Sequence, residues 1–291
     1  MKENWLKQLP IDPVIHYQEV SGGDVNAAYR IETQAGESLF LLVQAGRDQA
    51  FFAGEVAGLK RMAQAGIQVP EVIAFGDLEG DAYLILTYLD EVGQGSQKQL
   101  GELVARLHLT HQPEGLYGFD YPYQGSDISF SNQWTDCWVE LFVQRRLDGL
   151  AQSILNKGLW QESDIQVYRQ ARSIILDHLA HRHIDSSLLH GDLWAGNYMY
   201  LADGSVALCD PSSLYGDREL DLGVATVFGG FGPEFFQAYH EVYPLEAGYQ
   251  VRLEFYRLYY LMIHLNKFGS TYAGSVDLSL QKILSNPASS N

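Results

Sequence analysis

The chain has 291 residues, of which 46% are hydrophobic, and its formal net charge is −17 at pH 7. This length is long for one compact core and natural for two lobes or domains. The acidic balance argues against nucleic acid as a partner, because binding to phosphates needs clusters of lysine and arginine. A negative surface favours a cationic substrate instead.

No apolar run is long and charge-free enough to predict a membrane span, which needs about 18 residues or more. The segment from Met1 to Lys7 lacks the apolar core of a signal sequence, so export is not expected. The two cysteines, Cys137 and Cys209, fit a reducing compartment better than a disulfide scaffold. We therefore expect a cytoplasmic protein with a small-molecule partner, and the sequence leaves the oligomeric state open.

The N-terminal third predicts a small, strand-rich lobe. Apolar runs and alternation predict strands at residues 14–20, 27–33, 38–44, 69–75 and 82–88, and a helix at 49–65. The helix is indicated by Phe52, Val56 and Leu59, which recur every three or four residues, and Gly66 ends it.

A glycine-rich turn joins the first two strands. Its sequence is Ser21-Gly22-Gly23-Asp24-Val25-Asn26. Glycines tolerate positive φ and leave backbone N–H groups exposed, which a loop that covers phosphates requires. An ordinary hairpin turn is the alternative.

The remainder predicts a mostly helical lobe after a polar linker at 93–99. The helices are expected at residues 99–109, 132–154, 163–180, 233–243 and 246–266, and the chain should fray at 285–291. Two short strands, at 187–190 and 206–210, form the expected two-strand catalytic insert.

This order of elements predicts an α+β, bilobal, protein-kinase-like fold. Residues 1–86 would form a nucleotide-binding lobe with five strands and one helix, 87–99 the hinge and linker, and 100–291 the catalytic and substrate lobe. The nucleotide would lie between the lobes, next to Tyr88 and Leu89 of the hinge.

The segment between the two short strands carries the motif for phosphoryl transfer. It reads His190-Gly191-Asp192-Leu193-Trp194-Ala195-Gly196-Asn197 and is followed by Asp210-Pro211. Asp192 could accept a proton from a substrate hydroxyl, while Asn197 and Asp210 could hold the Mg²⁺ that bridges nucleotide phosphates. An acidic turn between two strands is the alternative reading of the same residues.

The chain resembles the fructosamine (ketosamine) 3-kinase family, a branch of the kinase-like fold related to aminoglycoside and choline kinases. The resemblance runs nearly end to end and is carried by four further segments: Glu55-Val56-Ala57-Gly58-Leu59, Asp210-Pro211 through Asp221, Phe228-Gly229-Gly230-Phe231 and His264-Leu265-Asn266-Lys267-Phe268-Gly269. The triplet Asp192-Leu193-Trp194 separates this family from aminoglycoside kinases.

The resemblance implies transfer of the ATP γ-phosphate to the C3 hydroxyl of a fructosamine- or ribulosamine-type adduct, with Asp192 as base and Mg²⁺ on Asn197 and Asp210. The nucleotide-binding residues that it implies are Gly22, Gly23, Asp24, Asn26, Glu55, Tyr88 and Leu89. The acceptor would contact Trp194, His264 and Asn266. Structural roles remain open for all three, Trp194 as a core side chain and the other two at a helix end. His190 is expected to brace the loop, and Arg218 and Asp221 are expected to form a structural ion pair or to anchor a loop.

The chain departs from the family pattern at the lysine that binds the nucleotide phosphates. Kinase-like enzymes place a lysine on the third strand, paired with a helix glutamate, but here Leu42 stands at that position opposite Glu55. Arg30 is the better of two candidate surrogates. Losing one such donor costs about 10²–10³ in rate, which slows an enzyme without erasing its activity. A working kinase is therefore favoured over a weakly active ATP-binding pseudokinase.

The chain also departs from the family pattern in the segment expected to bind the phosphate acceptor. Residues 121–132 do not align with the family's substrate loop, so the reaction type is better supported than the substrate. A kinase of another hydroxylated amine, such as an aminoglycoside, is the alternative.

Overall fold

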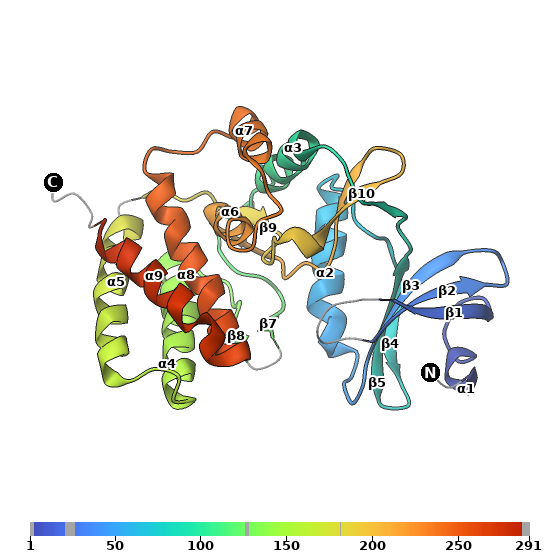
Figure 1. The fold of residues 1–291 in the computed structure, drawn as a ribbon. Coiled ribbons are helices and arrows are strands. Elements are labelled where there is room, and N and C mark those ends of the chain that lie inside the picture. The colour runs from blue at the N-terminus through green and yellow to red at the C-terminus, as the bar shows by residue number, and fades with distance from the viewer. Residues whose placement is uncertain (1–2, 21–26, 126–127, 181, 287–291) are drawn as a thin grey trace. The chain divides into compact units, whose positions relative to one another are not determined.

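The computed structural model describes residues 3–20, 27–125, 128–180 and 182–286. The chain divides into two compact units, which we call the N-unit (residues 1–95 and 199–210) and the C-unit (residues 96–198 and 211–291). The element labels are those of Figure 1.

The N-unit is built on an antiparallel sheet of five strands. They are β1 (Val14–Val20), β2 (Ala27–Thr33), β3 (Ser38–Gln44), β4 (Val72–Leu78) and β5 (Asp81–Thr87), in the order β1-β2-β3-β5-β4. All five were predicted. The fourth begins at Val72 instead of residue 69, because Pro70 has no N–H group to give to a strand ladder.

Helices cover both faces of this sheet. On one face, α2 (Ala50–Gln64) buries Phe52 and Val56 against strand residues that include Leu42 and Leu84. On the other face, α1 (Glu3–Leu6), which was not predicted, packs with β2, β3 and β5. Figure 1 shows the two helices on opposite sides of the strands. The sheet is therefore covered on both faces, and Leu42 belongs to the α2 side.

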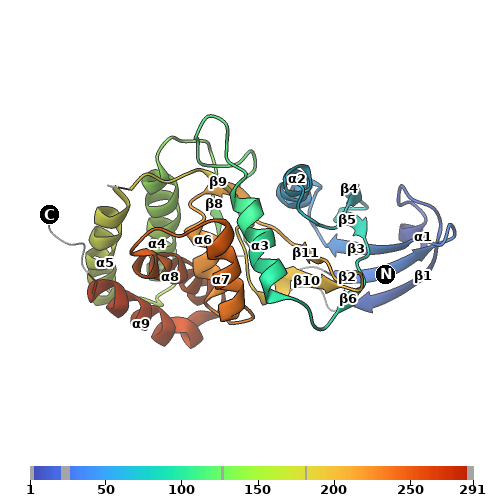
Figure 2. The ribbon, with the colours of Figure 1, turned by 90° about the horizontal axis from the view of Figure 1, so that it is seen from above.

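The prediction of a two-strand insert was wrong in its pairing. β9 (Ser187–Leu189) pairs with β12 (Leu214–Gly216), whereas β11 (Val206–Leu208) joins β10 (Tyr198–Leu201) and β6 (Glu91–Val92). Figure 2 shows β10 and β11 next to β6. β10 was missed because it follows the motif directly, and the Asp203-Gly204 turn then joins it to β11.

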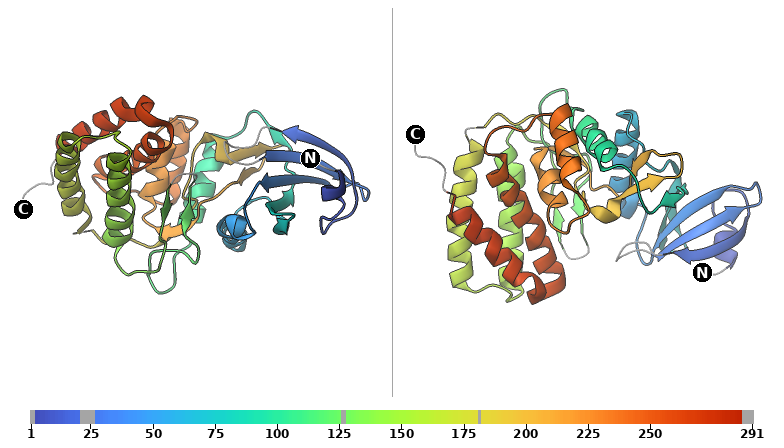
Figure 3. Two further views of the ribbon diagram at one scale, coloured as in Figure 1. Left: turned by 90° about the horizontal axis from the view of Figure 1, so that it is seen from below. Right: turned by 45° about the horizontal axis from the view of Figure 1, so that its top comes forward.

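The C-unit is mostly helical. Its helices are α3 (Gln97–His108), η1 (Glu140–Leu147), α4 (Asp148–Asn156), α5 (Glu162–Ala180), η2 (Ala195–Asn197), α6 (Glu219–Ala225), α7 (Pro233–Val242), α8 (Tyr249–Phe268), η3 (Gly269–Tyr272) and α9 (Ala273–Leu284). Figure 3 shows α8 and α9, in red, packed beside α4 and α5, in green. A hairpin of β7 (Tyr123–Gln124) and β8 (Ser129–Phe130) precedes η1.

Two helix predictions need correction. The helix expected over residues 132–154 begins only at Trp138, because Thr135 exchanges two backbone hydrogen bonds with Tyr117, at 2.8 and 2.9 Å. It continues as a π-helix, η1, before α4. The helix α9 was not predicted at all. No helix in the described ranges is long and apolar enough to cross a membrane.

Candidate active site

The loop that carries Asp192 is held by backbone hydrogen bonds to one buried carboxylate. Asp221, at 0% exposure, accepts the N–H groups of His190 at 2.7 Å and Gly191 at 2.8 Å. Gly191 has φ +83°, and a Cβ there would meet Ser212 O at 2.0 Å, so only glycine fits. The buried His190 then accepts the N–H of Asp192 through Nδ1 at 3.3 Å. His190 thus braces the loop, as expected.

Asp221 is itself held from behind. His108 Nε2 lies 3.0 Å from its carboxylate, and the Tyr239 hydroxyl lies 2.8 Å from His108 Nδ1. Of the two roles expected for Arg218 and Asp221, the structure has the loop anchor and not the ion pair: Arg218 donates to the carbonyls of Tyr243, at 2.8 Å, and of the next residue. Both residues therefore fix backbone, but they do not pair with each other.

The structure brings Asp192 and Asn197 together. Asn197 Nδ2 donates to Asp192 O at 2.9 Å and to Asp192 Oδ2 at 3.2 Å. The hydroxyl of Tyr260, on α8, donates to the other carboxylate oxygen, Oδ1, at 2.8 Å. The amide nitrogen of Asn197 faces the carboxylate, so these two hydrogen bonds do not use its amide oxygen.

The second expected metal ligand, Asp210, belongs to the N-unit. It follows β11 with φ +51°, a left-handed conformation that is uncommon outside glycine and is found at functional sites. Glu55 on α2 is close to it. Burial and, next, the Asp210 carboxylate raise the pKa of Glu55. A carboxylate and an amide oxygen are the donor types that Mg²⁺ takes from proteins alongside phosphate oxygens. Asp210 and Asn197 each carry one of these groups, and their role as metal ligands stays a prediction.

In the described part of the chain no basic group acts on Glu55, as the leucine at position 42 predicted. Leu42 is 7% exposed and packs against Phe52 and Leu84. Arg30, the candidate surrogate, donates to Ser38 Oγ at 3.0 Å and lies 4.4 Å from the ring centre of Tyr88. The apolar packing thus replaces the usual ion pair.

We expect Leu42→Lys to lower the stability of the protein and not to raise its rate. The change removes a packed apolar side chain and buries an ammonium among hydrocarbon groups, at a cost of about 2 kcal/mol or more. Urea unfolding and initial rates with Mg-ATP would measure both effects. Leu42→Met, which keeps the volume, is the control and should cost less than about 1.5 kcal/mol. A faster Leu42→Lys enzyme would contradict this expectation.

The remaining nucleotide-binding predictions lie in the N-unit. Tyr88 and Leu89 follow β5 and are half-buried, and the N–H of Tyr88 donates to Ser38 O at 3.3 Å. Gly22, Gly23, Asp24 and Asn26 lie outside the described residues. These roles stay predictions.

The three predicted acceptor residues differ in exposure. Trp194 is 39% exposed, and its ring lies so close to Gly196 that a Cβ there would meet it at 2.4 Å. His264 lies among aromatic rings, 4.6 Å from that of Tyr260 and 4.9 Å from that of Phe228. Asn266 is 3% exposed and accepts from the hydroxyl of a serine on α4 at 2.7 Å. Contact with an acceptor stays a prediction for each.

Comparison with known proteins decides the family. The sequence profile described as "Fructosamine kinase" matches residues 2–286. The chain belongs to the fructosamine kinase family. This confirms the predicted family and, with it, a kinase as the class of enzyme.

Members of the family from distant organisms align over most of the chain. A "Probable ketoamine kinase" of Staphylococcus aureus is 54% identical over 289 residues, which are 99% of this chain and 100% of that protein. The "Protein-ribulosamine 3-kinase, chloroplastic" of Arabidopsis thaliana is 33% identical over 262 residues, 88% of this chain and 78% of that protein.

Solved structures confirm the predicted fold. A crystal structure of a "Putative fructosamine-3-kinase" from Haemophilus somnus superposes with a TM-score of 0.82 at 27% identity, and covers 93% of this chain and 92% of its own. An aminoglycoside phosphotransferase in complex with ADP and hygromycin B gives a TM-score of 0.66 at 14% identity, with 96% of both chains covered. The bilobal, kinase-like α+β fold of this fructosamine kinase family member is thereby established.

Sequence reasoning missed two residues of the catalytic loop's surroundings. His108, on α3, contacts Asp221, which is 113 residues away and holds the loop, and Tyr260, on α8, contacts Asp192, which is 68 residues away. In the sequence each occupies one more buried position of a helix, so no local signal marks it.

Proposed function

We propose that this chain transfers the γ-phosphate of ATP to the C3 hydroxyl of a ketosamine, a fructosamine- or ribulosamine-type adduct. The observation that carries the proposal is the Asp192 carboxylate, which hydrogen bonds from Tyr260 and Asn197 hold within the loop. Family membership supports a ketosamine as the acceptor.

In the proposed reaction Asp192 orients the acceptor hydroxyl and takes its proton. The oxygen of that hydroxyl forms the new bond to the γ-phosphorus, and the bond from phosphorus to the ADP oxygen breaks. Asn197 and Asp210 would hold Mg²⁺, which supplies positive charge to the nucleotide phosphates when bound. In this proposal Asp192 is the side chain that takes the proton.

The acceptor's amine has a plausible recognition surface in the C-unit. A ketosamine carries a secondary amine that is protonated at neutral pH, and a cation is attracted to the face of an aromatic ring. Trp194 offers such a face, since it is 39% exposed and lies two residues from Asp192. We therefore assign Trp194, with His264, to the amine side of the acceptor.

In the N-unit we assign the backbone amides of Gly22, Gly23, Asp24 and Asn26 to the phosphates and Tyr88 and Leu89 to the base. Glu55 lacks the lysine that usually neutralises it, and Leu42 packs in that lysine's place. The lost donor predicts slower turnover than a lysine-bearing relative would show, by about 10²–10³ in rate.

A panel of acceptors tests the proposal. Purified protein with Mg-ATP would be offered a fructosamine, a ribulosamine, an aminoglycoside, free glucose and free ribose, and phosphorylated products would be detected by mass spectrometry. Phosphorylation of the ketosamines above an Asp192→Asn control supports the proposal. If only the aminoglycoside or the free sugars are phosphorylated, the protein is a kinase but a ketosamine is not its acceptor. Thermal stabilisation by ATP without any product would indicate a pseudokinase.

A further inference from the structure

The hydroxyl group of Tyr260 forms a hydrogen bond with one carboxylate oxygen of Asp192, the expected base. Its hydroxyl donates to Asp192 Oδ1 at 2.8 Å, and Tyr260 is 6% exposed. Burial and, next, the Asp192 carboxylate raise the pKa of Tyr260, so the phenol keeps its proton and is the donor in this hydrogen bond. The proton in this hydrogen bond therefore belongs to Tyr260, and the carboxylate stays able to accept another.

An aspartate carboxylate needs such a partner to hold one orientation. Rotation about the bond between its Cβ and its carboxylate carbon has broad, roughly two-fold minima, so the backbone alone does not fix the carboxylate plane. Asn197 Nδ2 contacts Oδ2 at 3.2 Å, and Tyr260 contacts Oδ1 at 2.8 Å. Two donors from different elements, η2 and α8, thus set the plane in which the remaining lone pairs point.

Tyr260 is itself packed against other side chains. It lies in the middle of α8, a helix of 20 residues. Its ring centre lies 4.6 Å from that of His264 and 5.8 Å from that of Phe228. Because the helix and the neighbouring rings fix the place of the Tyr260 hydroxyl, its hydrogen bond fixes the orientation of the Asp192 carboxylate.

We propose that Tyr260 is a positioning residue for phosphoryl transfer, which fixes the Asp192 carboxylate in the orientation that receives the acceptor's proton. It acts through Asp192 and does not touch the acceptor. The proposal rests on the assignment of Asp192 as the base, and it adds a residue that the motif around Asp192 does not contain.

Removal of the hydroxyl should lower kcat and leave nucleotide binding in place. Tyr260→Phe keeps the ring and its packing but frees one side of the carboxylate, and a base displaced by a fraction of an ångström costs about 10- to 100-fold in rate. The KM for ATP should stay within about threefold, because the contact of Tyr260 is with the base.

A matched control is available on the same helix. The hydroxyl of Tyr256, at 0% exposure, donates to Asp217 Oδ2 at 2.7 Å, a bond of the same kind to a carboxylate outside the catalytic loop. Tyr256→Phe should lower the melting temperature and change kcat by less than about twofold. Comparison of kcat in the two variants would separate the effect of losing a buried hydroxyl from the effect of losing the contact with Asp192.

A double-mutant cycle completes the test. Wild type, Tyr260→Phe, Asp192→Asn and the double variant would be compared in single turnovers with Mg-ATP and a ribulosamine. If Tyr260 acts through the base, its replacement should cost less than about twofold once Asp192 is asparagine. An equal loss in both backgrounds, an equal loss in Tyr256→Phe, or an unchanged kcat in Tyr260→Phe would overturn the proposal.

Failure of the proposed acceptor can be told apart from failure of this inference. If wild type phosphorylates no ketosamine, the proposed function falls, and the same four proteins are compared on the slow transfer of phosphate from ATP to water. The positioning role predicts the same pattern of rates there, because Asp192 would orient the water as it would a hydroxyl.

Discussion

Replacing Asp192 by asparagine should lower kcat by about 10²- to 10⁴-fold, the range that a positioned general base contributes. Asparagine keeps the size and the contact with Tyr260 but has no carboxylate to accept a proton. The KM for ATP should change little, since the loss falls on the chemical step. Initial rates of product formation with Mg-ATP and a ketosamine would measure both constants.

The matched control for this variant is Asp203→Asn. Asp203 is exposed in the turn between β10 and β11 and accepts hydrogen bonds from Ser205, at 2.9 Å from its N–H and 2.6 Å from its hydroxyl. Its replacement is the same chemical change outside the catalytic loop and should leave kcat within about twofold. If Asp192→Asn keeps more than about a tenth of the wild-type kcat, Asp192 is not the base.

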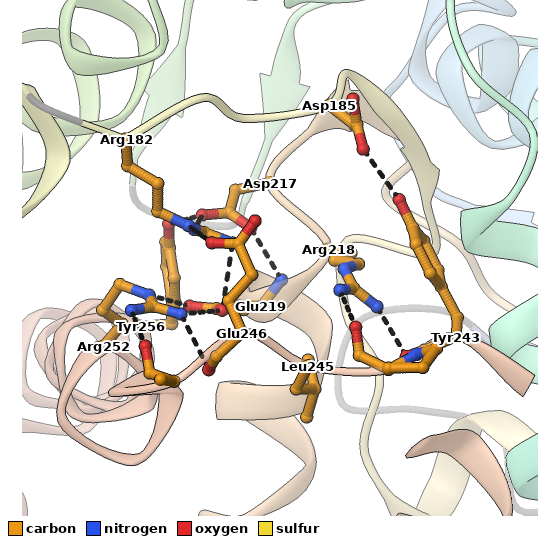
Figure 4. A network of polar contacts seen from close by, with 12 residues as sticks. Arg182, Asp185, Asp217, Arg218, Glu219, Tyr243, Leu245, Glu246, Arg252 and Tyr256 are labelled. Carbon is orange, nitrogen blue, oxygen red and sulfur yellow. Dashed lines mark hydrogen bonds and ion pairs between the residues drawn. The ribbon is translucent and has the colours of Figure 1, made fainter. Parts of the chain in front are cut away.

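The largest effect on stability is expected at Glu219. This carboxylate, at 0% side-chain exposure, accepts from Arg182 at 3.0 Å and from Arg252 at 2.7 and 2.8 Å. Figure 4 shows both guanidinium groups directed at it, with Asp217 also bonded to Arg182. Glu219→Ala would leave two nearly buried positive charges short of a partner and should lower the free energy of unfolding by about 3–5 kcal/mol.

Glu246→Ala is the control for Glu219→Ala. Glu246 also accepts from Arg182, at 2.9 Å, but its side chain is 57% exposed. Water already screens that pair, so its loss should cost no more than about 1 kcal/mol. Urea unfolding monitored by tryptophan fluorescence would compare the two variants. Equal losses would contradict the view that burial, and not the number of contacts with Arg182, sets the cost.

Local sequence was enough to predict much of the N-unit and the centre of the catalytic loop. Strands β1, β2 and β3 begin and end where the apolar alternation does, because each side chain's face follows from its own position in the strand. Asp192 and Asn197 are five residues apart, and one short helical turn, η2, brings them into contact.

Contacts between distant segments escaped prediction for physical reasons. Thr135 is not part of the helix expected at residues 132–154 because its backbone forms hydrogen bonds with Tyr117. The sequence around Thr135 contains no signal for that partner. In the same way β9 finds its partner in β12, beyond the catalytic loop, and Tyr260 reaches Asp192 from α8. Each depends on tertiary packing, which a pattern along one segment does not contain.

The departure at Leu42 was visible from the sequence, but its consequence needed the structure. The absence of the lysine predicted a weakened phosphate grip and suggested Arg30 as a substitute. In the structure Arg30 contacts Ser38 and Tyr88, and Leu42 packs within the apolar layer under α2. The apolar core of the N-unit is thus packed around the leucine, and the role of Arg30 as a surrogate stays a prediction.

The central claim is that this protein phosphorylates the C3 hydroxyl of a ketosamine. The most direct test is phosphorus–proton correlation NMR on the product formed from Mg-ATP and a ribulosyl- or fructosyl-lysine. The account predicts a phosphomonoester on O3, formed by wild type and absent with Asp192→Asn. A phosphate on another atom, or no phosphorylated product from either ketosamine, would contradict it.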